Sequence, residues 1–236
     1  KVIERKPVQF MILSLLVVAI GGIVEIIPTM IVDANISKIA SVKPYTPLEL
    51  EGRDIYIREG CYNCHSQLVR PLRFETARYG EYSKSGEFVY DHPFQWGSKR
   101  TGPDLAREGG NTKIRKSNFW HYEHLMAPKD VSPGSIMPAY TWLREDKLDL
   151  SLTPKKIRAM QTLGVPYAKG YDQKAIKDLK AQAHLIAEDI IKTTPKQALI
   201  GVNQKSLIKD IEQKEIVAVI AYLQRLGLDI TLKPKK

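Results

Sequence analysis

Cysteine is scarce in this chain, with two residues among 236. Acidic residues are also comparatively few, with 26 Asp or Glu against 36 Lys or Arg. Two cysteines cannot build the disulfide framework that stabilises small secreted domains, so that class is excluded. The net charge is +10, and residues 151–236 alone carry sixteen Lys or Arg against eight Asp or Glu. Such a surface suits anionic lipid or an acidic partner. Nucleic acid is not expected as a partner, because no aromatic–basic alternation or nucleic-acid-binding motif occurs.

Charge is almost absent from a long apolar run near the N-terminus. Residues 8–27 have the sequence VQFMILSLLVVAIGGIVEII, in which Glu25 is the only charged residue. About 20 apolar helical residues span a bilayer, and the run is too long for a signal peptide and lacks a cleavage site. A single membrane anchor is therefore predicted. Because Lys1, Arg5 and Lys6 precede it, we expect the N-terminus in the cytoplasm and the rest in the periplasm, at a bacterial inner membrane.

Both cysteines lie in one short motif, Cys61-Tyr62-Asn63-Cys64-His65. Two thiols at this spacing can each add to one vinyl group of a haem, and the histidine that follows can bind the iron from one face. A C-x-x-C pair alone would also suit a redox dithiol or half of a zinc site, but no second cysteine pair is present. The motif therefore predicts one covalently bound haem c, with Cys61 and Cys64 as thioether ligands and His65 as an axial ligand.

Cap and turn signals predict a mainly α-helical domain after the anchor. Thr46-Pro47-Leu48-Glu49 is a capping box with proline at the first helical position, and it predicts a helix that runs to about Gly60. Gly52 within it offers a flat surface, against which we expect Tyr222 to lie. From residue 66 to 137, scattered prolines break regular patterns, and only a short helix near 116–126 is predicted.

Helical periodicity returns toward the C-terminus. One helix should begin at Thr153-Pro154 and close at Gly164. A second should cover residues 172–192, and a third should run from about 207 to 226 and end at Gly227. The second has an apolar face formed by Ile176, Leu179, Ala183, Ile186 and Ile190.

The haem iron needs a second axial ligand opposite His65. Met137 is favoured because it lies in the segment Ser135-Ile136-Met137-Pro138, where the proline biases the residue before it away from helix. A His/Met pair raises the reduction potential and leaves no open coordination position, so the haem would carry electrons and would not bind oxygen. Six further residues stay open as candidates by sequence alone: His92, His121, His124, His184, Met126 and Met160.

Other polar residues are candidates to support the haem. A metal-bound imidazole donates its second N–H to a fixed acceptor, and the carbonyl of Pro103 is a candidate, although a plain turn explains the same residues. His121-x-x-His124 has metal-ligand spacing but no third ligand, so a propionate or interface role is expected instead. Guanidinium groups pair well with carboxylates. The candidates for the haem propionates are therefore Arg70 and Arg100, with Arg73 and Arg107 also available.

The chain resembles the membrane-anchored monohaem subunit (subunit II) of cbb3-type cytochrome c oxidases. The similarity runs from the anchor to about Trp142 and resumes at residues 221–227. It is carried by GRDIYIREGCYNCHSQLVRP, YDHPFQWGSKRTGPDLAR and HLMAPKDVSPGSIMPAY. The resemblance implies a class I cytochrome c fold, whose first and last helices cross around the haem. It also implies Met137 as the distal ligand and Pro103 as the support of His65.

The same resemblance implies a function. Electrons would pass from a dihaem cytochrome c subunit, through this chain's haem c, to haem b of a haem-copper catalytic subunit that reduces oxygen to water and pumps protons. This chain would then be a non-catalytic electron-transfer subunit of an enzyme. The segment 90–100 would face the catalytic subunit, with Gly97 and Ser98 at a calcium ion shared with it. The Lys-rich stretch from about 169 to 209 looks longer than usual in the family, so no function is transferred to it.

The expected organisation has three parts. Residues 1–33 form the N-terminus and anchor, 34–45 a linker, and 46–236 the periplasmic cytochrome c domain. Within that domain, the haem core (about 46–142 with the terminal helix about 207–227) is interrupted by a helical insertion (about 150–206). Two alternatives share some of these features: the haem c subunit of a membrane nitric oxide reductase, and a membrane-tethered C-x-x-C thiol oxidoreductase. The segments WGSKRTGPDL and SIMPAY favour the oxidase, and poor strand signals disfavour the thiol enzyme.

Overall fold

The computed structural model describes residues 4–31, 38–97, 99–110 and 113–231. Contacts divide the chain into two compact units, residues 1–38 and residues 39–236. Within the described residues the regular structure is helical, and no strand occurs beyond one isolated bridge between Lys147 and Lys214. The prediction of a mainly α chain is confirmed.

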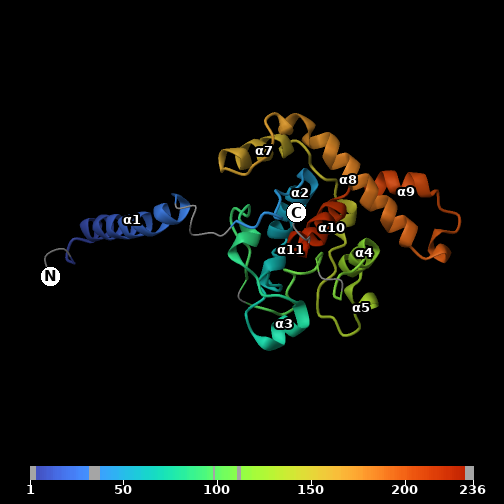
Figure 1. The fold of residues 1–236 in the computed structure, drawn as a ribbon, viewed down its shortest axis with the longest axis horizontal. Helices are drawn as coiled ribbons and strands as arrows, with labels where there is room; N and C mark the ends of the chain where they lie inside the picture. The colour runs from blue at the N-terminus through green and yellow to red at the C-terminus, as the bar shows by residue number, and fades with distance from the viewer. Residues whose placement is uncertain (1–3, 32–37, 98, 111–112, 232–236) are drawn as a thin grey trace. The chain divides into compact units, whose positions relative to one another are not determined.

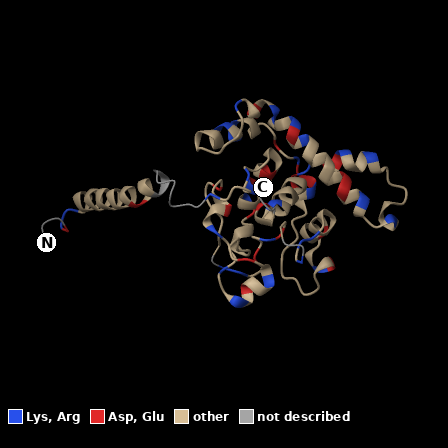
Figure 2. Cartoon of the chain, viewed as in Figure 1, with Lys and Arg blue, Asp and Glu red and all other residues tan. Residues whose placement is uncertain are grey.

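The first unit contains one helix, α1 (Pro7–Ile31). Its segment Pro7–Pro28 has a mean hydropathy of 2.7 and none of it is buried in the protein. Twenty-two helical residues extend about 33 Å, which matches the roughly 30 Å hydrocarbon layer of a bilayer. In Figure 2, the charge colour on α1 is one red patch toward its C-terminal end, and blue precedes the start of the helix. By length and composition, the predicted apolar helix is long enough to be a membrane anchor.

Two helices that are far apart in the sequence lie side by side in the second unit (Figure 1): α2 (Pro47–Arg58) and α10 (Glu215–Arg225). The capping box that starts α2 is formed, since Thr46 N–H donates to Glu49 Oε2 at 2.8 Å. Gly52 is the point of closest approach, because a Cβ there would lie 1.8 Å from the carbonyl oxygen of Ala218 and 3.0 Å from Cβ of Tyr222. The expected contact between Gly52 and Tyr222 is confirmed.

The remaining elements follow in chain order. The predicted helices near 116–126, 153–164 and 172–192 are present as α4, α7 and α8, whereas α3 was not foreseen from the proline-rich sequence. The helices are α3 (Arg73–Tyr79), α4 (Asn118–Met126), α5 (Pro128–Val131), α6 (Trp142–Glu145), α7 (Thr153–Thr162), α8 (Tyr171–Thr193), α9 (Gln204–Ile211) and α11 (Leu228–Thr231), with single 3-10 turns η2 (Cys61–Asn63), η3 (Ser85–Phe88) and η4 (Lys196–Leu199).

The prediction of one continuous helix over 207–226 is wrong, because the chain breaks between α9 and α10. A neighbouring segment takes up the backbone groups at the break. Leu148 N–H donates to the carbonyl of Gln213 at 2.8 Å, and Glu215 N–H donates to the carbonyl of Asp146 at 3.2 Å. The apolar periodicity continues across the break, since Ile211 and Ile216 are both buried. Periodicity alone therefore could not locate it.

The helical insertion supplies part of the main core. Leu179, Ala183 and Ile190 of α8 are buried with residues of α2 and α10, while Ile176 and Ile186 are half-buried at the edge of that face. The predicted apolar face of α8 is confirmed. One face of α10 packs on α2, and the side chains of Val219 and Leu223 line a cavity beside it. This arrangement sets the walls of the site.

Candidate haem site

The C-x-x-C-H motif lies in a tight turn directly after α2. Gly60 follows the helix with a φ of +68°, in the left-handed region that glycine adopts readily. The motif then forms the 3-10 turn η2, in which the N–H of His65 donates to the carbonyl of Cys61 at 2.9 Å. This turn brings Cys61, Cys64 and His65 to the wall of one cavity. The two cysteines are not joined in a disulfide.

The cavity has a volume of about 630 Å³, within the range of about 300–1,000 Å³ that cofactor sites occupy. Apolar side chains form much of its wall, including Tyr56 of α2, Leu125 of α4, and Val219 and Leu223 of α10. A cavity of this size, open to two thiols and an imidazole, fits a haem that packs against apolar side chains. Segments far from the C-x-x-C-H motif in the sequence also contribute residues to the cavity wall: Tyr79, Pro103, Leu105, Ile114, Trp120, Ile136, Met137 and Tyr140.

His65 is held in the orientation that an iron ligand requires. Its Nδ1 lies 2.8 Å from the carbonyl oxygen of Pro103, to which it donates, and this leaves Nε2 without a proton. Burial lowers the pKa of His65, against the opposing effects of the Pro103 hydrogen bond and the Asp104 carboxylate. The imidazole is therefore neutral at neutral pH, as metal ligation demands.

Gly102 makes room for this histidine, which sequence reasoning did not foresee. A Cβ at Gly102 would lie 2.3 Å from Cε1 and 2.8 Å from Nδ1 of the His65 ring. The expected result of Gly102→Ala is a displaced ring, loss of the Pro103 bond, and a His65–iron bond weakened about 10–100-fold, as for other partners of metal ligands. Carbon monoxide binding to the reduced protein measures the opened coordination position.

Gly22→Ala is the matched control, because the same added methyl group would meet nothing within 4 Å there. Carbon monoxide binding by Gly102→Ala no greater than by Gly22→Ala would disprove the packing argument.

Met137 reaches the same cavity from an irregular segment after α5. Its N–H is 3.2 Å from Ser135 Oγ, and the N–H of Tyr140 donates to the carbonyl of Leu125 at 2.8 Å, which ties the segment to α4. Of the seven axial candidates, Met137, His121 and His124 line the cavity. The others do not: Met160 is buried in a separate cluster, His184 pairs with Glu212 on the surface, and Met126 and His92 lie outside the cavity wall.

Buried polar atoms without a partner gather at this cavity. The described residues contain four such side-chain atoms, and three of them belong to cavity-lining residues: Tyr56 Oη, His121 Nε2 and His124 Nδ1. Burial lowers the pKa of His121 to about 3 and raises that of nearby Glu108 to about 7. Their closest atoms are 3.6 Å apart, too far for a hydrogen bond. Unpartnered polar atoms in an apolar cavity fit a ligand that carries polar groups.

Comparison with known proteins decides the assignment. The family model described as cytochrome c oxidase, mono-haem subunit/FixO, matches residues 1–230. The chain belongs to the FixO family. A search of curated proteins finds no match. Membership makes this a mono-haem subunit of cytochrome c oxidase, which is an oxidoreductase complex, and one haem is the cofactor that the family description implies.

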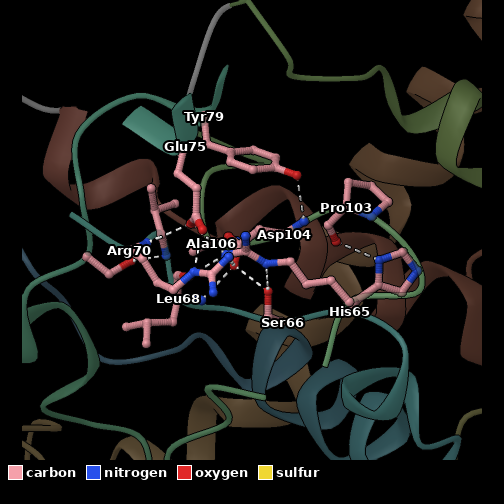
Figure 3. A network of polar contacts seen from close by, with 12 residues as sticks. His65, Ser66, Leu68, Arg70, Glu75, Tyr79, Pro103, Asp104 and Ala106 are labelled. Carbon is pink, nitrogen blue, oxygen red and sulfur yellow. Dashed lines mark hydrogen bonds and ion pairs between the residues drawn. The ribbon is translucent and has the colours of Figure 1, made fainter. Parts of the chain in front are cut away.

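In this FixO-family chain, Arg70 and Arg100 do not line the cavity. Both guanidinium groups instead pair with Glu75, whose side chain is fully buried. Figure 3 shows the pair of Arg70 and Glu75. Arg100 Nη2 also lies 3.2 Å from Asp104 Oδ2. The geometry gives no support to their predicted role at the haem propionates. The cations that do line the cavity are Arg78, Lys113 and Lys116.

The network has a different consequence for the site, because it holds the segment after Pro103. Asp104 Oδ2 accepts from Ser66 Oγ at 2.7 Å and from the N–H of Leu68 at 2.8 Å, while Oδ1 accepts from the N–H of Ala106 at 2.9 Å. These bonds join the two segments that carry His65 and Pro103 (Figure 3). The Pro103 carbonyl is thereby fixed opposite His65.

Glu75 makes the network sensitive to acid. Hydrogen bonds from Arg100 first, and then from Arg70, lower the pKa of Glu75 to about 2. Its stabilising effect is full above the ordinary carboxyl pKa, near 4.5, and is lost as pH falls from there toward 2. Glu75→Gln should therefore lower the free energy of unfolding by roughly 3 kcal/mol at pH 7 and by much less near pH 3. Denaturant unfolding at the two pH values measures this.

Glu81→Gln serves as the control, because that carboxylate is 62 % exposed and pairs only at the surface with Lys84. It should change stability by less than about 1 kcal/mol. Equal losses for the two variants at pH 7 would contradict the role given to Glu75.

The predicted calcium ligands are only partly visible. Gly97 has a φ of +61°, and a Cβ there would lie 3.1 Å from the carbonyl oxygen of Tyr62, so this glycine packs against the haem-attachment turn. Ser98 lies outside the described residues. Among the described residues, no group of three or more His, Cys, Asp or Glu side chains could hold a metal ion.

Proposed function

We propose that this chain is the electron-transfer subunit of a cbb3-type oxidase. It receives electrons from a dihaem cytochrome c subunit and passes them to haem b of the haem-copper catalytic subunit, supporting oxygen reduction to water and proton pumping. The observation that carries the proposal is the convergence of Cys61, Cys64, His65 and Met137 on one cavity, in a chain that the FixO family model matches over residues 1–230.

Each residue of the site has one task in this proposal. The Cys61 and Cys64 thiols each add S–H across one vinyl C=C bond, so two thioethers form without a leaving group or an oxidant. His65 Nε2 and the Met137 sulfur would hold the haem iron, since both residues line the cavity. When bound, the haem supplies one-electron chemistry at its iron. With both ligands supplied by the protein, the iron would have no free position for oxygen, and this subunit would carry electrons without being catalytic itself.

The same proposal places the chain at the bacterial inner membrane. The helix α1 crosses the bilayer once with the N-terminus in the cytoplasm, as the preceding basic residues favour. Residues 1–33 are then the anchor, 34–45 a linker, and 46–236 a haem domain in the periplasm. A calcium ion shared with the catalytic subunit at Gly97 and Ser98 belongs to the proposal as well, with the remaining ligands supplied by that subunit.

The chemistry of Cys61 argues against a thiol oxidoreductase. Burial first, and then Glu59 and Cys64, raise the pKa of its thiol to about 12. Reactive thiols in C-x-x-C enzymes have a lowered pKa and lie at the start of a helix. Here the pair lies in a turn after the end of α2. A half-buried, protonated Cys61 thiol on a cavity wall suits covalent haem attachment better.

Purification of the intact membrane complex through a tag on this chain tests the function. We expect copper in the catalytic subunit, oxygen consumption with a reduced cytochrome donor, and one haem c attached to this chain. A complex that contains non-haem iron without copper, and that reduces nitric oxide, would replace the oxidase with a nitric oxide reductase.

A further inference from the structure

The connection between α8 and α9 presents an apolar tip to solvent. It contains η4 (Lys196–Leu199) and ends where α9 begins at Gln204, and in Figure 1 it lies at the outer end of α8. Ile200 is 80 % exposed and Val202 is 43 % exposed. Two aliphatic side chains are thus exposed within three residues of one turn, which makes the tip a candidate contact site.

Packing and hydrogen bonds hold this tip in a defined turn. Leu199 packs against the main core, and the N–H of Val202 donates to the Leu199 carbonyl at 3.2 Å. Asn203 then caps α9 by accepting from the N–H of Ser206 at 3.3 Å. With Leu199 turned inward and both ends of the turn bonded, Ile200 is held outward.

Lysines flank the tip along the chain. Residues 190–209 contain four lysines, all exposed, and no Asp or Glu: Lys192, Lys196, Lys205 and Lys209. Within the described part of the chain these four form no ion pair. The acidic residues that flank the stretch bond elsewhere, Asp189 to Asn118 at 2.8 Å and Asp210 to Arg144 at 2.6 Å. Figure 2 shows lysine colour along α9 and at the end of the turn.

We propose that residues 192–209, here called the lysine-rimmed loop, bind the anionic surface of the bilayer in which α1 is anchored. Aliphatic residues that enter the headgroup boundary, surrounded by cations that meet lipid phosphates, form the usual pattern of an interfacial lipid contact. An acidic protein would be attracted by the lysines but would not need the aliphatic tip. The contact can be weak and still populated, because the anchor keeps the haem domain at a high local concentration near the membrane.

The loop would thus give the domain a second attachment point and restrict its orientation above the membrane. The proposal rests on membrane anchoring through α1, and the loop itself lies outside the residues assigned to the haem. The family resemblance assigned no function to the Lys-rich insertion. In this proposal, part of that insertion serves as the membrane contact.

A fluorescence experiment on the full haem-loaded chain tests this contact. In the proposed function thioethers occupy Cys61 and Cys64, so an environment-sensitive dye should label Ile200→Cys and leave the unchanged chain unlabelled. The labelled chain is then placed in lipid nanodiscs. With phosphatidylglycerol present, we expect a blue-shifted emission and quenching by doxyl-labelled lipid. In phosphatidylcholine alone both effects should be much smaller. Each lysine of the loop changed to glutamine should weaken the contact roughly fivefold.

Leu185→Cys is the matched control, because Leu185 is 64 % exposed on α8 but lies outside the lysine-rimmed loop. No quenching at position 200, or equal quenching at both positions, would overturn the proposal. Shielding that appears only when the other oxidase subunits are added would assign the loop to a protein partner instead. Failure of the anchor itself would be distinct, since the chain would then not co-purify with the discs.

Discussion

Replacement of Met137 by alanine should abolish the low-spin His/Met spectrum of the haem and lower its reduction potential. Met137 lines the cavity, and in the proposed function its sulfur is the sixth ligand, so its loss would leave the iron with His65 alone or with water. Axial ligands control haem potentials over a span of about 0.8 V. Each fall of about 59 mV makes reduction by the donor tenfold less favourable. We therefore expect oxygen consumption by the complex to fall at least about tenfold.

Met126→Ala is the internal control for this prediction. Met126 is half-buried against the core at the end of α4 and does not line the cavity. It should reduce stability while leaving the absorption spectrum and the potential unchanged. A low-spin spectrum retained in Met137→Ala would show that another residue is the sixth ligand of the iron. His121 and His124 would then be tested next, because both line the cavity.

Changing both Cys61 and Cys64 to alanine should remove all covalently held haem. The consequence extends to folding, because the cavity of about 630 Å³ has apolar walls that depend on a bound group to fill it. A ligand present at 1,000 times its dissociation constant contributes about 4 kcal/mol to stability, and we expect a loss of this order. Haem staining of denatured chain and the amount of chain in the membrane measure the two effects.

Cys64→Ala alone provides a graded comparison, because one thioether would remain. Its chain should keep haem after denaturation, at a lower yield than the unchanged protein. Full haem staining in the double variant would show that the thiols are not the attachment points.

Local sequence signals predicted the helices of the haem domain well where a cap or a glycine has a single physical use. Thr46, Glu49 and Gly52 fixed both the start of α2 and its contact with α10, since a capping box and a residue without a side chain leave few alternatives. The break between α9 and α10 was missed because it depends on Asp146 and Leu148, which approach from elsewhere in the chain. No sequence pattern within residues 207–226 indicates that Asp146 and Leu148 will bond to the backbone there.

In the site too, local motifs could be predicted from the sequence, whereas contacts between distant segments could not. The spacing of Cys61, Cys64 and His65 is sufficient by itself to predict a haem site. The roles of Gly102 and of the Glu75 network needed the structure, because Gly102 matters through its distance to the His65 ring and Glu75 through two arginines. The arginines were expected at the propionates from their charge, but charge does not show which carboxylate a guanidinium meets. A buried glutamate in the same chain already supplies that partner.

The most direct test of the central claim is mass spectrometry of the peptide that carries Cys61–His65, taken from native complex after extraction with acidified acetone. We predict a peptide heavier by one haem, with no free thiol. Recovery of the haem in the acetone, together with an unmodified peptide whose two thiols can be alkylated, would contradict the account.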